Sequence, residues 1–449
     1  MNLMKIAMPV LIMIAAAVSL AGPIETLPVN AWYEVPNSHL NSVAPSGWAA
    51  NVMDPWSSGA FDTKRNNLII WGGGHGDYSG NEIYLFSLDS LKWTRASNPS
   101  NPPAVDVPYA SDGGPCSRHT YDYIQYVPAV DRFCSFGGAG FYQTGQTGTN
   151  NLDAFNFDTK TWGQFAVVPS CGGNIGSISA VDGGTGYAWY HGTGGYSWAA
   201  HWNPVTNVWT AHGKIWNMED LDYNHTAAID SKRHKMVAVG AGTVLVWNLQ
   251  PDTGYIYYSA LTTTGATGIT GGGNPGVEYD PKSDKIVAWR GGSNVFTLDM
   301  DTHVWTQYSG TGATPTAAAP NGTFGRFRYS PKSNVFVAVN TISQDVFIYR
   351  LTAGSGTKTE TPAVRAGIAV EVSPNPFVGK TQVRLIIEGS KASSVKIMDI
   401  NGREMADLTQ ALRQKSSVEW NPGALPAGIY FVSAKIGNRR ITTRLLLQK

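Results

Sequence analysis

A histidine stands inside a run of glycines between two apolar segments of this chain. The stretch WGGGHGDYSGNEIY covers residues 71–84 and contains His75, Asp77 and Tyr78. A neutral imidazole can take up a proton, a phenol can donate one, and a carboxylate can orient either group. The glycines alone would be enough to turn the chain, so the neighbouring polar residues are candidates for chemistry.

Further histidines, tyrosines and arginines occur near the ends of other apolar segments. Arginine can neutralise a ligand carboxylate, and histidine and tyrosine can exchange protons or donate hydrogen bonds. The additional candidates are Arg118, His119, Tyr142, His191, Asn224, His225, Arg290 and Arg326.

Several reaction classes lack their required residues. The glycine run is not followed by Lys-Ser or Lys-Thr, so it is not a phosphate loop, and no G-x-S-x-G turn indicates a serine hydrolase. Cys134 lies within an apolar segment, which does not suit a copper site with a Cys–Tyr cross-link. Acidic residues near the candidates are few, mainly Asp77 and Glu82 with Asp222 as a further one, so paired catalytic carboxylates are hard to nominate.

The elements that position these residues form a repeat. Apolar strand-length segments recur as NNLIIWGGG, DRFCSFGGAG, TGYAWYHGTGG, HKMVAVGAG, DKIVAWRGG and SNVFVAVN. A later strand in four of the units carries a tryptophan, at Trp93, Trp162, Trp209 and Trp305. Six units fit between about residues 50 and 351. A repeat of roughly 40 to 50 residues with four strands per unit predicts an all-β propeller.

The ends of this repeat predict how the ring closes. The last unit ends at VFIYRLT without a tryptophan strand, and residues 30–35 supply one, so we expect them to pair there and remove an open edge. We count six blades. A seventh around residues 98–115 or 310–322 remains an alternative.

Alternation of loops places the candidate residues together. Antiparallel strands put the loop between strands two and three on the same face as the connection into strand one. We call this face the loop face, and expect all the candidate residues there. We call the opposite face, with turns such as DPKSDK and SPKSNV, the turn face, and predict that these turns are purely structural.

The Gly-Gly strand ends and the tryptophan strands resemble kelch, or galactose-oxidase-like, propellers over about residues 30–352. SRHTY and GGGHGDYSGNE are also similar to segments of propeller-type polysaccharide lyases such as ulvan lyases. Histidine, tyrosine and arginine without paired carboxylates suit β-elimination on a uronic-acid glycan, which needs no cofactor. The expected base and acid are His75, His119 and Tyr142.

In that scheme the remaining candidates bind the substrate. Arg118 and Arg326 would hold the uronate carboxylate, and the other expected contacts are Tyr78, His191, Asn224, His225 and Arg290. The alternative is a non-catalytic propeller that binds a glycan or a protein through the same face. A histidine in a glycine turn also occurs as an ordinary hydrogen-bonded loop residue.

Composition narrows the class of protein. The formal net charge is +1, with 33 basic and 32 acidic residues, so no nucleic-acid partner is expected. Residues 1–21 read as a signal peptide, with Lys5 before a short apolar run, and no membrane span follows. Three cysteines, Cys116, Cys134 and Cys171, allow one optional disulfide and one buried thiol, without a metal-binding spacing.

A second module follows the propeller predicted over residues 22–352. Residues 353–365 are small, polar and threonine-rich, as in a linker, and residues 366–449 show alternating strands with NG and AG turns, which predicts a small Ig-like β-sandwich. Its motifs SPNPF, VKIMDINGRE and LPAGIYF resemble the type IX secretion C-terminal sorting domain. That resemblance implies a partner, the type IX machinery, and a secreted or cell-surface location. We expect a monomer that meets extracellular polysaccharide.

Overall fold

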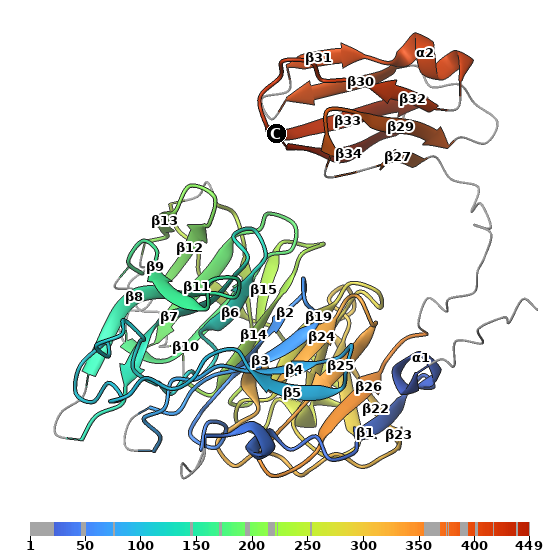
Figure 1. Cartoon of the computed structure of the whole chain (residues 1–449). Helices are drawn as coiled ribbons and strands as arrows, with labels where there is room; N and C mark the ends of the chain where they lie inside the picture. The colour runs from blue at the N-terminus through green and yellow to red at the C-terminus, as the bar shows by residue number, and fades with distance from the viewer. Residues whose placement is uncertain are drawn as a thin grey trace, which may run out of the picture. The chain divides into compact units, whose positions relative to one another are not determined.

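The computed structural model divides the chain into two compact units, Met1–Gly356 and Thr357–Lys449 (Figure 1). The signal peptide predicted over residues 1–21 and residues 354–365 of the predicted linker lie outside the described residues. None of the described helices is long and apolar enough to cross a membrane. The described residues are 22–45, 51–74, 77–143, 147–169, 173–193, 198–213, 221, 223–251, 254–353, 369–373, 375, 377–386, 394–399, 403–415, 417–436 and 439–448.

In the described part of the first unit, the strands form six sheets. Three sheets comprise β2–β5 (Gly59–Asp62, Asn67–Ile70, Tyr84–Ser87, Lys92–Arg95), β6–β9 (Ile124–Val127, Arg132–Gly140, Thr147–Asn156, Thr161–Gln164) and β10–β13 (Gly173–Val181, Ala188–Thr193, Ala199–Asn203, Val208–Ala211). The others comprise β14–β17 (His225–Asp230, Lys235–Gly240, Thr243–Asn248, Tyr258–Ala260), β18–β22 (Thr264–Gly265, Gly276–Asp280, Lys285–Trp289, Asn294–Leu298, Val304–Ser309) and β23–β26 (Thr311–Gly312, Phe327–Ser330, Val335–Ala338, Val346–Arg350) with β1 (Ala31–Val35).

The first long strands of these sheets form a ring. Strand β2 contacts β6, and the series continues through β10, β14, β19 and β24, which contacts β2 again. The first strands are buried along most of their length because sheets pack against them on both sides. This arrangement is consistent with a propeller-like all-β fold, as the repeat predicted.

The N-terminal strand completes the last sheet, which confirms the predicted closure. Strand β1 pairs antiparallel with β26, with Trp32 opposite Tyr349. The Trp32 ring lies 4.8 Å from the Tyr349 ring and 5.6 Å from Trp289, and its indole N–H donates to the Ser293 carbonyl at 3.0 Å. Segments more than 300 residues apart in sequence are thereby joined, and the edge of β26 is covered.

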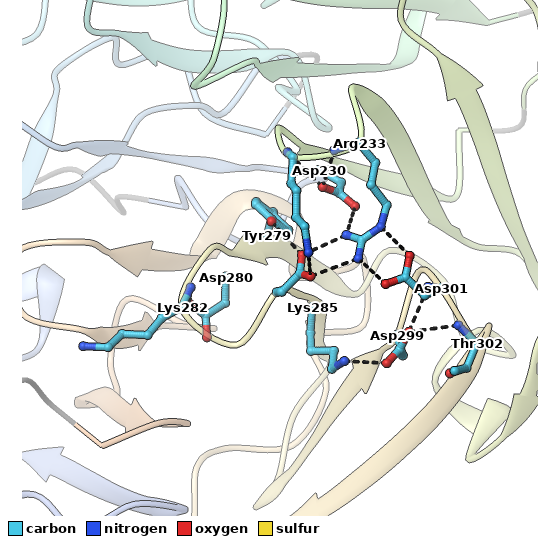
Figure 2. A network of polar contacts seen from close by, with 11 residues as sticks. Asp230, Arg233, Tyr279, Asp280, Lys282, Lys285, Asp299, Asp301 and Thr302 are labelled. Carbon is cyan, nitrogen blue, oxygen red and sulfur yellow. Dashed lines mark hydrogen bonds and ion pairs between the residues drawn. The ribbon is translucent and has the colours of Figure 1, made fainter. Parts of the chain in front are cut away.

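Ion pairs between neighbouring turns hold the turn face together. Nη1 of Arg233 lies 2.7 Å from Asp230 and 2.8 Å from Asp284, and Nη2 lies 2.7 Å from Asp301. Figure 2 shows Asp230 and Asp301 directed toward the Arg233 guanidinium. Hydrogen bonding to Arg233 holds the pKa of the Asp284 carboxyl well below its usual range. Arg65 joins Asp62 to Asp131 in the same way between the first two sheets. These turns therefore have a structural role.

The second unit packs two sheets around one core. One sheet orders its strands β27-β29-β32 and the other β28-β34-β33-β30-β31. Buried residues of both sheets share a single apolar cluster that includes Val383, Trp420, Val432 and Leu445. The elements are β27 (Ala369–Ser373), β28 (Phe377–Val378), β29 (Thr381–Ile386), β30 (Ser394–Asp399), β31 (Glu404–Asp407), α2 (Thr409–Gln414), β32 (Ser417–Trp420), β33 (Gly428–Ile436) and β34 (Arg439–Gln448).

Two of the three cysteines lie among the described residues. Cys116 and Cys134 are both buried and neither forms a disulfide among the described residues. Burial raises the pKa of the Cys134 thiol far above its usual range, so this thiol stays protonated and inert. Cys171 lies outside the described residues.

Candidate functional site

The glycine run docks directly on the SRHTY segment of the next sheet. Gly73 and Gly74 have φ values of 128° and 74°, and the Gly74 N–H donates to the Tyr78 carbonyl at 2.9 Å. A Cβ on Gly74 would overlap the backbone of Arg118 and His119. The glycine is therefore required both for its left-handed conformation and for this close approach. His75 lies outside the described residues.

This docking brings Asp77 to His119. Nε2 of His119 lies 2.8 Å from Oδ2 of Asp77. The imidazole is almost fully buried, at 4% side-chain exposure, whereas the carboxylate is 41% exposed. The histidine therefore holds the aspartate in place, and the aspartate is the group that solvent or a ligand meets. Sequence reasoning placed Asp77 on the loop face but did not assign it a role.

Aromatic rings surround the His119–Asp77 pair. The His119 ring lies 5.2 Å from the half-buried Trp56 and 6.1 Å from Tyr121, and Tyr121 meets Phe324 edge-on at 6.0 Å. Burial raises the pKa of the Tyr121 phenol to about 12, so it remains neutral.

Three of these aromatic residues have unusual backbone conformations. Trp56, Tyr121 and Phe324 have φ values of 45°, 38° and 47°, and each stands three residues before the first strand of its sheet. Bulky side chains rarely adopt positive φ, and such strain gathers at ligand-binding and catalytic positions. The sequence carried no signal for this feature.

Tyr78 is an anchor for the loop. It is only 6% exposed, and its hydroxyl donates to Oε1 of Glu82, which also accepts from Tyr84. Burial raises the pKa of the Tyr78 phenol well above its usual range. This does not agree with the expectation that Tyr78 contacts substrate, because its polar atom is directed to Glu82. The cluster instead fixes the segment that presents Asp77.

Arg118 is not available as a carboxylate clamp. Its side chain is fully buried, with Nη2 2.5 Å from Asp153 and Nη1 2.9 Å from the Gly137 carbonyl, and its guanidinium lies over Trp71. Asp153 also accepts a hydrogen bond from Tyr109 at 2.9 Å. Arg118 was expected to hold a substrate carboxylate, but the carboxylate that pairs with its guanidinium is that of Asp153 within the protein.

The donors of Arg326 are likewise used within the protein. It is fully buried, and its guanidinium donates to the backbone carbonyls of Val339, Met53 and Gly322 at 3.2, 2.9 and 2.6 Å, and to that of Ser57. Burial lowers the pKa of Arg326 to about 10. Its role is to join the last sheet to the segment before β2, which corrects the predicted role in substrate binding.

His191 lies between the third and fourth sheets. It is 3% exposed, its ring meets Trp247 at 5.4 Å and Tyr258 at 5.9 Å, and Nδ1 lies 2.7 Å from the Gly192 carbonyl. Burial lowers the pKa of His191 to about 4, so the ring is neutral. It is a packing residue, which differs from the expected substrate contact.

The remaining candidates His225, Asn224 and Arg290 lie at or next to strand ends on the loop face. Nε2 of the buried His225 lies 2.8 Å from Oγ1 of Thr243, which lines a threonine-rich pocket of about 350 Å³. Asn224 is half-buried, and its carbonyl accepts from Asn274 at 3.3 Å. Arg290 is half-buried beside Gly272 and forms no ion pair within the described part of the chain.

Tyr142 is half-buried beside the SRHTY segment, since the preceding residue, Phe141, donates its N–H to the Ser117 carbonyl at 2.8 Å. The structure thus brings Asp77, His119 and Trp56 together, with Tyr142 on the neighbouring segment. Among the described residues, no group of three or more His, Cys, Asp or Glu side chains is placed to hold a metal ion.

Comparison with known proteins establishes the class of the second unit and the destination of the chain. Residues 371–448 match the secretion system C-terminal sorting domain. This domain directs export through the type IX system to the cell surface or the extracellular space, and it implies an interaction with that secretion machinery.

Comparison of the whole chain gives no further identification. No curated protein matches it. A structural genomics protein of unknown function from Bacteroides thetaiotaomicron is similar to it, with 11% sequence identity and a TM-score of 0.44, over 71% of this chain and 75% of that one.

Proposed function

We propose that the first unit is an exported glycan-binding propeller whose loop face receives the ligand at Trp56, Asp77 and His119. The observation that carries this proposal is the Asp77 carboxylate, which is held by His119 beside a half-buried tryptophan. The finer architecture belongs to the same proposal. The six sheets are six kelch-like blades, the second unit is an Ig-like sandwich, and the protein is a monomer.

The chemistry of a sugar ring suits this arrangement. Its hydroxyl groups donate to a carboxylate, and hydrogen bonds to an ionised acceptor are the stronger ones. Its C–H face packs against the flat face of an aromatic ring, which binds at low conformational cost because tryptophan has few rotatable bonds. Strained backbone at Trp56 and Tyr121 supports a binding role, because folding alone does not favour bulky residues there.

Elimination on a uronate glycan is the second candidate, favoured by the hydrogen-bonded His119–Asp77 pair with Tyr142 beside it. It has less support than binding. Nε2 of His119 already faces Asp77, and Arg118 and Arg326 are buried with protein partners. Of the predicted arginines, Arg290 is the one left to neutralise a uronate carboxylate.

The test measures binding and cleavage separately. Full-length protein is run through gels containing ulvan, alginate, pectin or a glycosaminoglycan, and retardation gives the affinity. We expect retardation by at least one of these glycans, and a loss of about 10-fold or more in affinity for Trp56→Ala and Asp77→Asn. Asp158→Asn, which changes a 75% exposed carboxylate that pairs with Arg65 on the turn face, is the matched control.

Formation of the unsaturated uronyl product, followed by its absorbance, decides between the two candidates. Product that disappears in His119→Ala while retardation persists would establish elimination. No retardation by any of the four glycans, or retardation unchanged in both Trp56→Ala and Asp77→Asn, would refute the proposal of a glycan site on the loop face.

A further inference from the structure

A cavity of about 640 Å³ occupies the centre of the ring and opens toward the turn face. All six first strands contribute to its lining, from Phe61 of β2 to Tyr329 of β24. Its volume is within the usual range for small-molecule sites. The proposed glycan site does not use it, because Trp56 precedes β2 whereas Phe61 stands near the end of that strand.

The wall of the cavity is aromatic and held rigid. Phe61, Tyr126, Tyr279 and Tyr329 each occupy the next-to-last position of a first strand. The three phenol groups donate to Asp131 at 2.8 Å, to Asp284 at 3.0 Å and to Asn334 at 2.8 Å. Because these hydroxyls are committed to the turns, the rings are fixed and offer the cavity their carbon atoms.

The inner end of the cavity is polar. Nη1 of Arg328 lies 3.4 Å from Oε2 of Glu278, while Nε and Nη2 of Arg328 donate to the Gly59 carbonyl at 3.1 and 3.0 Å. Glu278 keeps 22% of its side chain exposed, whereas Arg328 keeps 5%. The arginine donors are therefore largely used within the protein, and the carboxylate is the polar group that faces the cavity.

A second carboxyl lies just behind this pair. Oδ1 of the fully buried Asp122 is 4.0 Å from Nη2 of Arg328 and has no hydrogen-bond partner among the described residues, while Oδ2 accepts from the Ala227 N–H at 2.7 Å. Burial raises the pKa of Asp122 to about 8, so this carboxyl is mostly protonated at neutral pH. Burial also raises the pKa of the Glu278 carboxyl, and the adjacent Arg328 guanidinium opposes that rise. The inner end therefore presents one guanidinium and the carboxyl group paired with it.

This balance of charge determines what the cavity can hold. Because Glu278 and Arg328 already pair with each other, a charged ligand would find no unpaired opposite charge, and burying an unpaired charge is costly. A neutral ligand with hydroxyl groups can donate to Glu278, and its apolar face can lie against the fixed rings. We infer that the central cavity is a second binding site, specific for a neutral sugar unit, on the face opposite the proposed glycan site.

Saturation-transfer NMR on the full-length protein tests this inference. The probes are methyl glucoside, methyl galactoside and N-acetylglucosamine, with tetramethylammonium chloride and sodium benzoate as charged comparisons of similar size. We expect transfer to at least one sugar and to neither ion. No transfer to any of the three sugars, or transfer only to an ion, would overturn the assignment.

Variants locate the site and separate it from the loop face. Glu278→Gln is expected to weaken sugar binding by about 10-fold or more, since a hydrogen bond to a charged acceptor is lost. Glu404→Gln, which makes the same change at a 46% exposed carboxylate paired with Lys396 in the second unit, is the matched control and should bind as the wild type does. Phe61→Leu tests the aromatic wall independently and should also weaken binding.

Thermal melting of each variant confirms that it is folded. Trp56→Ala should leave binding of the small sugars unchanged, so failure of this inference and failure of the loop-face proposal give different results. Unchanged affinity in both Glu278→Gln and Phe61→Leu would place the bound sugar elsewhere and refute the cavity site.

Discussion

The neutral, buried His191 predicts how the stability of the first unit responds to acid. In the folded protein the pKa of His191 is lowered to about 4, because burial between Trp247 and Tyr258 disfavours the charged ring. In the unfolded chain the pKa is about 6.5. Between these values the unfolded state binds more protons than the folded state, so the free energy of unfolding falls as the pH falls.

The size of the effect follows from the two pKa values. The contribution of His191 is fully present above pH 6.5 and is lost progressively toward pH 4. At pH 4 the loss amounts to about 3 kcal/mol, at about 1.4 kcal/mol for each pH unit of difference. Replacing His191 with glutamine removes the titrating group, so the variant should lack this part of the acid sensitivity even if it is less stable at pH 7.

Urea unfolding at pH 7, 5.5 and 4 measures the difference. Tryptophan fluorescence reports mainly on the first unit, because Trp420 alone of the 15 tryptophans lies in the second. The change in unfolding free energy from pH 7 to pH 4 should be about 3 kcal/mol smaller in His191→Gln than in the wild type. His39→Gln, a 45% exposed histidine paired with Asp345, is the control and should follow the wild type. Parallel pH profiles for wild type and His191→Gln would refute the reasoning.

Two further predictions concern the residues around the loop face. Asp153→Ala leaves the Arg118 charge buried and unpaired, so we expect the free energy of unfolding to fall by about 3–5 kcal/mol. The control Asp77→Ala removes a 41% exposed carboxylate and should lower it by less than about 1 kcal/mol. Equal losses in urea unfolding would contradict the structural role of Arg118. Gly74→Ala should displace the loop that carries Asp77 and abolish glycan retardation. Gly113→Ala is the control, because Gly113 has a similar φ of 83° but lies in open space, and this variant should still be retarded. Retardation that survives Gly74→Ala would show that glycan binding does not need the close contact between Gly74 and the Arg118–His119 backbone.

The repeated strands and the ring closure could be predicted because they are encoded locally. Each apolar segment has the length and composition of a strand, and β1 was identified because the last unit ends without a tryptophan strand and the N-terminal segment can supply one. The side on which a loop emerges follows from strand alternation, which placed Asp77 and His119 together correctly. Local pattern and global fold agree here, as expected for a repeat.

The burial of the arginines and the identity of their partners could not be predicted from the same pattern. Arg118 and Arg326 precede first strands and look alike in sequence, yet one pairs with Asp153 and the other with backbone carbonyls. An arginine next to a strand is compatible with burial or exposure, and only its partners decide. The one sequence signal for the burial of Arg118 was Asp153, which stands between the buried Leu152 and Ala154 in a strand. A carboxylate in such a position is rarely buried without a cationic partner.

Equivalent positions of the first strands differ in polarity around the central cavity. The position two residues before the end of the first strand holds Ala60 in β2 and Ala228 in β14, so the fold accepts a methyl group there. The equivalent positions in β6, β19 and β24 hold Gln125, Glu278 and Arg328. Bringing polar and charged groups into the centre of the ring costs free energy that alanine would avoid. Gln125 and Arg328 hydrogen-bond to neighbouring strands, at Ser179 and Gly59, whereas Glu278 keeps part of its side chain exposed to the cavity. The presence of Glu278 there is best explained by what the cavity binds, and replacing Glu278 tests that explanation directly.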